Sequence, residues 1–432
     1  MKNLKSTDNQ IYDVIIIGAG ASGLFAAASA GFDAKGTAPQ CQGNSFKGLL
    51  LEKTARPGTK LLMSGSGQCN ITHAGSVKEF VSCYGDKGKK IRSCLYKHSN
   101  LELMDFLESN GVEVFTREDG KVFPKSMDAH DVLYMLLRRA KKNGFELKCD
   151  SEVTGLCHID DLWQVTASGG DNSAAAYYAR NVIIATGGCS YPTTGSDGSF
   201  FNVLRNDLGI EITELKPSLT PIQVNEYPYS ELSGISFENI HTSIWHKDKL
   251  SGKNADEKKI AETCEDLLFT HKDLSGPAVI NISKYAQPGG KLKINYLHPL
   301  NYEQVLDRLK KAFHGAKGSA ANIIAAEFDL PKRFCQLLVA RHGEALKNLA
   351  HGLTGEEFVI NSVSGFNKAM ATAGGIDLKQ ISTSTFGFKE IPGLYAIGEA
   401  LDVDGITGGY NLQFAYSSAR AVMITVQKEN IL

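Results

Sequence analysis

Three glycines near the start of the chain have the spacing of a turn that binds a dinucleotide. Gly18, Gly20 and Gly23 follow an apolar run, residues 11–17, and precede a run of small residues, 24–30, that is expected to be helical. The first glycine permits the tight turn, the second lets the backbone approach a pyrophosphate, and the third lets helix and strand pack closely. The free N–H groups and positive dipole end of the helix then suit two phosphates. The residues expected to line this turn are Gly18, Ala19, Gly20, Ala21, Ser22 and Gly23.

An acidic residue at the end of the next strand is the partner that such a turn requires. The apolar run 48–51 ends in Glu52, which is expected to bind the adenosine ribose hydroxyls. Glu52 comes 29 residues after Gly23. Residues 33–47, rich in Gly, Ala, Pro, Gln and Asn taken together, read as a loop insertion that explains this length. An acid at this position argues against a phosphorylated ribose, so FAD or NAD fits better than NADP.

Two later stretches favour a flavin over a nicotinamide as the bound dinucleotide. A buried strand, residues 181–184, runs into Ala185, Thr186, Gly187 and Gly188 after a hairpin, an order that is typical of FAD enzymes of the glutathione-reductase type. Near the C-terminus, another strand ends in Gly398 and Glu399, and a helix follows a Gly-rich loop. A positive helix end placed there would stabilise the negative charge that a reduced flavin develops at N1 and the C2 carbonyl. The residues expected at this end of the flavin are Gly398, Glu399, Asp404, Gly409, Tyr410, Asn411 and Leu412.

The bulk composition describes an ordinary soluble protein of more than one domain. The chain has 432 residues, 42% of them hydrophobic, and carries 46 basic and 47 acidic residues. The near-zero net charge gives no electrostatic signal for nucleic acid or an anionic membrane. No apolar run reaches the ~20 residues of a membrane span, and the polar first ten residues lack a signal-peptide core. We therefore expect a cytoplasmic protein with a small-molecule substrate, no nucleic-acid partner and no membrane partner.

The cysteines and histidines indicate neither disulfides nor a metal site. The nine cysteines are scattered, odd in number and without a C-x-x-C pair, which fits reduced thiols in a cytoplasm. The histidines show no metal-ligand spacing with a carboxylate or a cysteine, so no metal is expected.

Periodicity and capping residues predict the surrounding elements. Residues 100–110 and 128–143 read as amphipathic helices, the second one capped by Asp128. The basic stretch 85–92 reads as a solvated loop. Residues 162–179 read as a hairpin around a turn at 169–172. Ser275 reads as the cap of a helix with Pro277 in its first turn.

The residue composition changes twice along the chain, which predicts an inserted domain. The predicted fold class is α/β: a Rossmann-type FAD-binding domain of the glutathione-reductase type with an inserted β-rich and helical substrate domain. The FAD-binding domain takes residues 1–197 and 356–432, and the substrate domain takes residues 198–355. An active site is expected at their junction.

Long motifs give the chain a resemblance to a known family. Residues 58–72, 185–198 and 393–418 are similar to motifs of the YhiN/BaiN-like, or aminoacetone oxidase-like, bacterial NAD(P)/FAD-dependent oxidoreductases. Residues 267–271 and 274–278 match the middle part of that family, so the resemblance runs through nearly the whole chain. Thr59 and Gln68 depart from it, because the family usually has arginine at both positions.

The resemblance implies bound FAD and names further site residues. Residues 64–70 are implied to pass the isoalloxazine. The additional residues expected to bind the cofactor are Lys53, Lys60, Ser64, Gly65, Gly67, Gln68, Cys69, Asn70 and Val153. Cys69 is either a redox thiol or, as we favour, a small packing residue. Tyr410, Tyr191 and His271 are the candidate catalytic residues, each with a packing or structural role as the alternative.

The resemblance also implies a reaction. The leading expectation is NAD(P)H-driven reduction of an activated C=C bond, as on bile-acid-like ketosteroids. The alternatives are an O₂-dependent oxidase of a small, aminoacetone-like amine, and a flavin-bearing binding or RNA-modification partner. Because no second G-x-G-x-x-G follows a strand, NADH or NADPH would have to act as a transient reductant in the substrate cleft.

Overall fold

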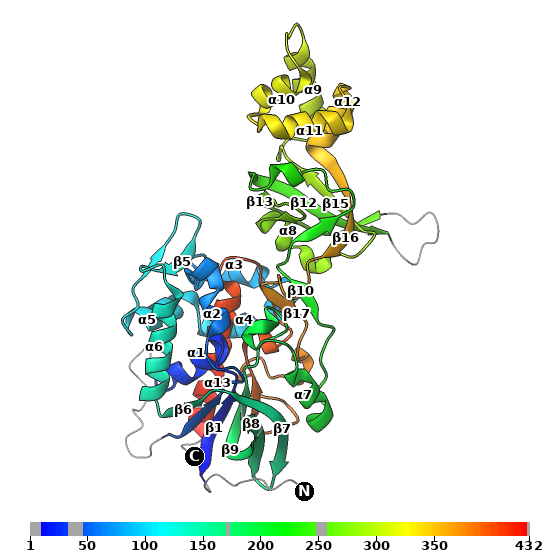
Figure 1. Ribbon diagram of the computed structural model, residues 1–432. Helices are drawn as coiled ribbons and strands as arrows, with labels where there is room; N and C mark the ends of the chain where they lie inside the picture. The colour runs from blue at the N-terminus through cyan, green and yellow to red at the C-terminus, as the bar shows by residue number, and fades with distance from the viewer. Residues whose placement is uncertain (1–9, 33–45, 170–172, 248–256, 430–432) are drawn as a thin grey trace. The chain divides into compact units, whose positions relative to one another are not determined.

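A parallel sheet organises the first of two compact units in this computed structural model (Figure 1). The structure describes residues 10–32, 46–169, 173–247 and 257–429. Unit 1 consists of Met1–Lys216 and Ala371–Leu432, and unit 2 of Pro217–Met370. The chain passes from one unit to the other at two points, near the strands β10 (Lys216–Ser218) and β17 (Ala371–Ala373).

The unit 1 sheet has the strand order β6-β2-β1-β9-β8-β7, with β18 also paired to β9. Strands β6, β2, β1, β9 and β18 are parallel, whereas β7, β8 and β9 form an antiparallel meander. The bounds are β1 (Ile11–Ile17), β2 (Gly48–Leu51), β6 (Phe145–Lys148), β7 (Ser151–Ile159), β8 (Leu162–Gly169), β9 (Ala174–Ile184) and β18 (Leu394–Ala396). This sheet with a meander is the Rossmann-type arrangement that the sequence predicts.

Helices pack on this sheet, which explains why the ends of its central strands are apolar and buried. Val14, Ile15 and Ile16 in β1 have no exposed surface, as parallel strands covered on both faces require. Helices α1, α6 and α13 lie together in Figure 1, and α1 packs against both others. The helices of unit 1 are α1 (Ala21–Ser29), α2 (Thr59–Leu62), α3 (Val77–Ser82), α4 (Gly88–Lys97), α5 (Asn100–Glu108), α6 (Ala129–Lys142), α7 (Phe200–Leu208) and α13 (Tyr410–Glu429).

A small antiparallel sheet in unit 1 has the order β3-β5-β4. Its strands are β3 (Thr72–His73), β4 (Val114–Thr116) and β5 (Lys121–Pro124). Short 3-10 turns complete unit 1: Ser64–Gly67, Gly85–Lys87, Pro192–Thr194, Leu378–Gln380 and Gly398–Ala400. The first and last of these turns carry predicted cofactor residues.

Unit 2 combines a closed barrel with helices. The barrel order is β11-β14-β13-β12-β15-β16, and Glu356 at the start of β16 is fully buried, where it accepts hydrogen bonds from the hydroxyls of Tyr229 and Tyr296. The strands are β11 (Ile222–Val224), β12 (Ser236–Lys247), β13 (Glu257–Phe269), β14 (Leu274–Ser275), β15 (Lys291–Asn295) and β16 (Glu356–Val363). The helices are α8 (Pro277–Ile280), α9 (Tyr302–Phe313), α10 (Ala320–Phe328), α11 (Lys332–His342) and α12 (Leu346–Gly355), with 3-10 turns at Ser230–Leu232 and Ser283–Tyr285.

Several predicted elements are present. Helices α5 and α6 match the amphipathic predictions, and the Asp128 carboxylate accepts the N–H of His130 as an N-cap. Strands β8 and β9 form the predicted hairpin, although residues 170–172 of its turn lie outside the described residues. The same holds for residues 33–45 of the predicted loop insertion.

Two local predictions are wrong for identifiable physical reasons. The basic stretch 85–92 is not a loop, because α4 begins at Gly88, where a Cβ atom would overlap the backbone carbonyl of Val81. This glycine therefore serves close helix packing rather than a turn. Ser275 lies in β14 and caps nothing, since Gly276, with φ of 81°, takes the N-cap position before Pro277.

The units divide the chain at residues 216 and 370, whereas the sequence analysis places the boundaries at 197 and 355. Helix α7, which follows residue 197, packs on β7 of unit 1, and the Asp207 carboxylate accepts the N–H of Leu156 (2.9 Å). Strand β16, which follows residue 355, pairs with β11 and β15 in the barrel of unit 2. These pairings join residues far apart in the chain, so composition alone does not reveal them.

Candidate functional site

The glycine turn after β1 is shaped by two steric requirements and one open space. Gly18 has φ of 101°, and a Cβ atom there would lie 2.6 Å from the carbonyl oxygen of Ala185. A Cβ atom on Gly23 would overlap the carbonyl of Gly18. A Cβ atom on Gly20 would meet nothing within 4 Å, so the backbone faces free space there. This is the arrangement that a closely approaching pyrophosphate requires.

The start of α1 supplies donors to that space. Its N-cap is Gly20, no side chain of the described residues caps the helix, and its first turn contains no acid. The first N–H groups of a helix have no partner within the helix and carry its positive dipole end. Ala21 and Ser22 occupy this first turn. The residues present therefore fit a dinucleotide diphosphate.

Glu52 lies against the glycine turn, as a ribose-binding acid should. It directly follows β2 and is 7% exposed, and its Oε2 accepts the N–H of Ala19 (2.8 Å). Its Oε1 accepts the N–H of Thr54 (2.9 Å). These bonds fix the carboxylate beside the turn while carboxylate lone pairs remain for ribose hydroxyls. Lys53 faces other acids, because its Nζ contacts Asp197 (2.7 Å) and Glu152 (2.9 Å).

The second and third motifs reach the same turn. The N–H of Ala185 donates to the carbonyl of Ile17 (2.8 Å), which places the Ala185–Gly188 segment beside Gly18. Gly398, with φ of 62°, donates its N–H to Ser418 Oγ, and a Cβ atom there would lie 2.7 Å from the Ser22 side chain. Thr186 and Gly187, also predicted to bind the cofactor, complete the Ala185–Gly188 segment. Val153 is buried in β7, whose first N–H, on Ser151, donates to the carbonyl of Glu52.

A polar cluster joins the three family motifs. The Lys60 ammonium donates to Glu399 Oε2 (2.7 Å) and also contacts Ser190 Oγ. Ser190 Oγ donates to Glu399 Oε1 (2.6 Å), and the N–H of Thr372 donates to the same oxygen (3.0 Å). A Cβ atom on Gly188 would lie 3.0 Å from Glu399 Oε1. The sequence motifs predict Lys60, Gly188 and Glu399 as cofactor residues. Ser190 lies inside a recognised motif but was not predicted, and the sequence gives no signal for Thr372.

The loop from Ser64 to Asn70 contains residues in left-handed conformation. Gly65, Gly67 and Cys69 have φ of 55°, 88° and 63°, and the N–H of Cys69 donates to the carbonyl of Ser64 (2.9 Å). Burial raises the pKa of the Cys69 thiol to about 11. At neutral pH the thiol is therefore protonated, which favours packing over a redox role. Gln68 follows the turn and is partly buried.

Asn70 links this loop to the start of α13. In the amide orientation that satisfies both of its groups, Asn70 Oδ1 accepts the N–H of Gly409 (3.2 Å) and Nδ2 donates to the carbonyl of Thr72 (3.0 Å). A Cβ atom on Gly409 would lie 2.6 Å from the backbone of Thr72. The Asn411 side chain exchanges two hydrogen bonds with the backbone of Gly405. Asp404 is buried, and Leu412 is partly buried in the first turn of the helix.

The three catalytic candidates lie in different surroundings. The Tyr410 ring is 8% exposed and packs on His73, with ring centroids 5.6 Å apart, and edge-on against Phe80. Tyr191 is partly buried, follows Ser190 of the polar cluster and has φ of 52°. Left-handed backbone in a non-glycine residue is uncommon and gathers at functional sites. His271 is exposed in unit 2, between β13 and β14.

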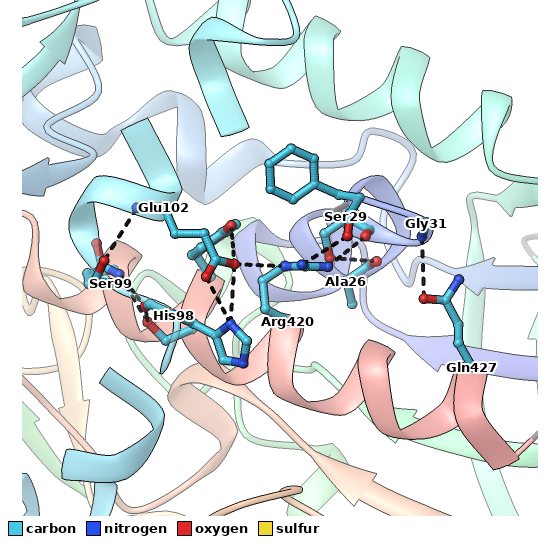
Figure 2. A network of polar contacts seen from close by, with 12 residues as sticks. Ala26, Ser29, Gly31, His98, Ser99, Glu102, Arg420 and Gln427 are labelled. Carbon is cyan, nitrogen blue, oxygen red and sulfur yellow. Dashed lines mark hydrogen bonds and ion pairs between the residues drawn. The ribbon is translucent and has the colours of Figure 1, made fainter. Parts of the chain in front are cut away.

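A buried arginine network holds α1 and α13 together, the two helices whose N-termini carry the cofactor motifs. Figure 2 shows Arg420 on α13 reaching Glu102 on α5 and the last turn of α1. Its guanidinium donates to Glu102 Oε1 (3.0 Å) and to the carbonyls of Ser29 and Phe32 (3.0 Å each). Burial alone would raise the pKa of Glu102, but hydrogen bonds and charge from His98 and Arg420 outweigh it and lower this pKa below its ordinary value.

Comparison with known proteins decides the family. The model of the HI0933-like protein Rossmann domain matches residues 12–423 of this chain. The chain belongs to the HI0933-like family. The predictions of the family, of a Rossmann-type FAD-binding fold and of an FAD-dependent oxidoreductase are thereby confirmed. Among the described residues, no helix is long and apolar enough to cross a membrane.

Relatives of this HI0933-like protein span nearly its whole length. It is 30% identical to a ribosomal RNA dihydrouridine synthase of Haemophilus influenzae, over 98% of this chain and 100% of that one. It is 29% identical to the enzyme of the same name from Escherichia coli, over 95% and 96%. It is 27% identical to a 3-dehydro-bile acid delta(4,6)-reductase of Clostridium scindens, over 93% and 96%. A flavocytochrome c3 fumarate reductase in its open conformation shares the fold, with a TM-score of 0.50, 14% identity, and coverage of 99% of this chain and 80% of that one.

Proposed function

We propose that this protein reduces a C=C bond conjugated to a carbonyl, and that the bond belongs to a uracil ring of ribosomal RNA. The observation that carries the proposal is the identity of 30% and 29% to two ribosomal RNA dihydrouridine synthases, each over at least 95% of this chain. Formation of dihydrouridine adds a hydride to C6 and a proton to C5 of uracil, whose C5=C6 bond is conjugated to the C4 carbonyl. FAD, when bound and reduced, would supply the hydride from N5.

The name of the third relative describes the same kind of reduction on a different substrate. A 3-dehydro-bile acid with double bonds at positions 4 and 6 carries them in conjugation with its 3-oxo group, and reduction again adds hydride and proton to a polarised C=C bond. A bile-acid-like steroid is therefore the second candidate substrate, supported by 27% identity over 93% of this chain. None of the relatives named above is an amine oxidase.

The chain's own residues would orient the ring and manage one proton. Tyr191 is our candidate proton donor, because it directly follows Ser190 of the Lys60–Ser190–Glu399 cluster and is only partly buried. Tyr410 fits this role less well, since its ring is enclosed by other aromatic rings. NADH or NADPH would reduce the flavin as a transient donor, a part of the proposal that rests on family resemblance.

A nucleic-acid substrate departs from the expectation based on net charge. That expectation used the whole chain, on which 46 basic and 47 acidic residues nearly balance. A balanced total is compatible with a local basic face, and binding to phosphates depends on the local face.

The test is product analysis with both substrates. The FAD-loaded protein is incubated without oxygen with NADH or NADPH and either unmodified bacterial ribosomal RNA, transcribed in vitro, or a 3-oxo-Δ4,6 bile acid. Nuclease digestion and mass spectrometry then measure dihydrouridine, and the steroid is analysed for added hydrogen. Dihydrouridine formed at a defined position supports the proposal. Turnover of the steroid alone would assign the second candidate, and turnover of neither would contradict the reaction class.

A further inference from the structure

The exposed face of α4 is basic along its whole length. Lys89, Lys90, Arg92 and Lys97 are all exposed, and the ten residues of the helix include no acid. None of these four cations has an ion pair with a carboxylate among the described residues. Between residues 76 and 98 the chain carries six basic and two acidic residues, although its total is nearly balanced. Positive charge is therefore concentrated on this segment.

An exposed aromatic ring lies on the same face. Tyr96 is 49% exposed, and the Arg92 guanidinium lies 5.4 Å from the centre of its ring. Unpaired RNA bases stack on exposed aromatic rings and on arginine planes, while lysines neutralise the phosphates. A tyrosine held by an arginine between lysines combines both kinds of contact.

The two acids of this segment do not cancel the basic face. Glu79 on α3 forms a capping box with Ser76, so its carboxylate serves the start of that helix. Asp86 is exposed and lies 3.8 Å from the Lys87 ammonium. Lys87 in turn donates to Asp402 Oδ2 (2.6 Å) and is not part of the free face.

The segment just before α4 is bonded to the loop that is expected to meet the flavin. The carbonyl of Cys83 accepts the N–H of Ile406 (3.0 Å), and the Tyr84 hydroxyl donates to the carbonyl of Tyr410 (2.8 Å). Together with the Lys87–Asp402 ion pair, these contacts fix the start of α4 beside the 402–410 loop. A polymer bound along α4 would thus be held next to the cofactor motifs of unit 1.

We propose that the α4 basic face, formed by Lys89, Lys90, Arg92, Tyr96 and Lys97, binds the backbone and an unpaired base of the RNA substrate. The inference rests on the proposed function, because it assigns the docking surface for that RNA. The face contacts RNA next to the reacting uridine and contributes to binding, not to hydride transfer.

Helix α6 offers matched control positions. Lys141 and Lys142 are adjacent exposed lysines at its C-terminal end, and Tyr134 is 62% exposed on the same helix. The test variants are Lys89→Glu/Lys90→Glu and Tyr96→Ala. The controls are Lys141→Glu/Lys142→Glu and Tyr134→Ala, which make the same changes in charge and in aromatic surface.

Binding of unmodified bacterial ribosomal RNA, transcribed in vitro, is measured by filter retention at several salt concentrations, together with the KM for dihydrouridine formation. We expect Lys89→Glu/Lys90→Glu to make the negative slope of log K against log salt shallower by about 2, because two phosphate contacts are lost. The KM should rise roughly tenfold. Tyr96→Ala should weaken binding about fivefold or more. Both control variants, and reduction of the flavin by NAD(P)H without RNA, should match the wild type.

The outcomes separate this inference from the proposed function. Dihydrouridine formation by the wild type with equal KM and salt slope in the α4 and α6 variants would overturn the inference and leave the function standing. Failure of the wild type to form dihydrouridine would contradict the function. In that case the salt dependence of RNA binding still tests the α4 inference. Absence of salt-dependent RNA binding by the wild type would overturn this inference as well.

Discussion

Replacing Arg420 with methionine should destabilise unit 1 by about 3–5 kcal/mol, because it removes one partner of a buried ion pair. The Arg420 side chain is 5% exposed and that of Glu102 is 16% exposed. Without the guanidinium, the Glu102 carboxylate retains, among the described residues, hydrogen bonds to His98 and to the Tyr416 hydroxyl. The carbonyl of Phe32 also loses the Arg420 donor, whereas the carbonyl of Ser29 still accepts the N–H of Phe32 (3.0 Å). These losses are part of the same total and are not additive.

The two tryptophans allow unit 1 to be followed by itself. Trp163 is fully buried in β8 of unit 1, and Trp245 lies in β12 of unit 2. In a Trp245→Phe background, urea unfolding measured by tryptophan fluorescence therefore reports unit 1. Glu102→Gln/Arg420→Met should recover part of the lost stability, because the remaining buried charge is gone.

Arg205→Met is the matched control. Arg205 is exposed on α7, and within the described part of the chain its side chain donates one 3.3 Å hydrogen bond, to Asn202 on its own helix. We therefore expect a change below about 0.5 kcal/mol. If Arg420→Met lies within about 1 kcal/mol of Arg205→Met, the network does not stabilise the packing of α1 against α13 as we argue.

Four further results follow from the site. Gly20→Ala should destabilise the cofactor-free protein by no more than about 1 kcal/mol, the cost of alanine at an N-cap, since its Cβ meets nothing within 4 Å. It should weaken FAD binding at least about tenfold, measured by flavin fluorescence. Tyr191→Phe should lower the rate of product formation by about 10²-fold or more, with NAD(P)H-dependent flavin reduction retained. Cys69 should resist iodoacetamide at pH 7 in the folded protein, while the exposed Cys157 is labelled, as mass spectrometry of peptides can show. The pKa of Glu102 is lowered in the folded state, so the stability that its carboxylate contributes is complete above its ordinary pKa of 4.5 and is lost as the pH falls further. The difference in unfolding free energy between wild type and Glu102→Gln, measured with urea, should therefore shrink below pH 4.5.

Local patterns in the sequence predict the geometry of the glycine turn and the start of α6. Gly23 accommodates the carbonyl of Gly18 a few positions earlier, Gly20 leaves open space at the start of α1, and Glu52 directly follows the neighbouring parallel strand. The Asp128 cap and the amphipathic pattern after it likewise depend on residues a few positions apart. Such short-range requirements leave a direct trace in the order of residue types.

Features that depend on distant partners were not readable. Gly88 looked like a loop residue because the Val81 carbonyl that it accommodates becomes relevant only once α3 and α4 pack. Glu102 and Arg420 are 318 residues apart, and Thr372 joins the polar cluster from beyond unit 2. The pairing that closes the unit 2 barrel through β16 is equally long-range.

The measurement that tests the central claim most directly is a single-turnover reoxidation of the flavin. The FAD-loaded protein is reduced anaerobically with NADH, NADPH or dithionite and mixed with unmodified bacterial ribosomal RNA while its absorbance is recorded. We predict that oxidised flavin returns with one equivalent of dihydrouridine formed per flavin. A flavin that stays reduced in the presence of this RNA, with no dihydrouridine formed, would contradict the account.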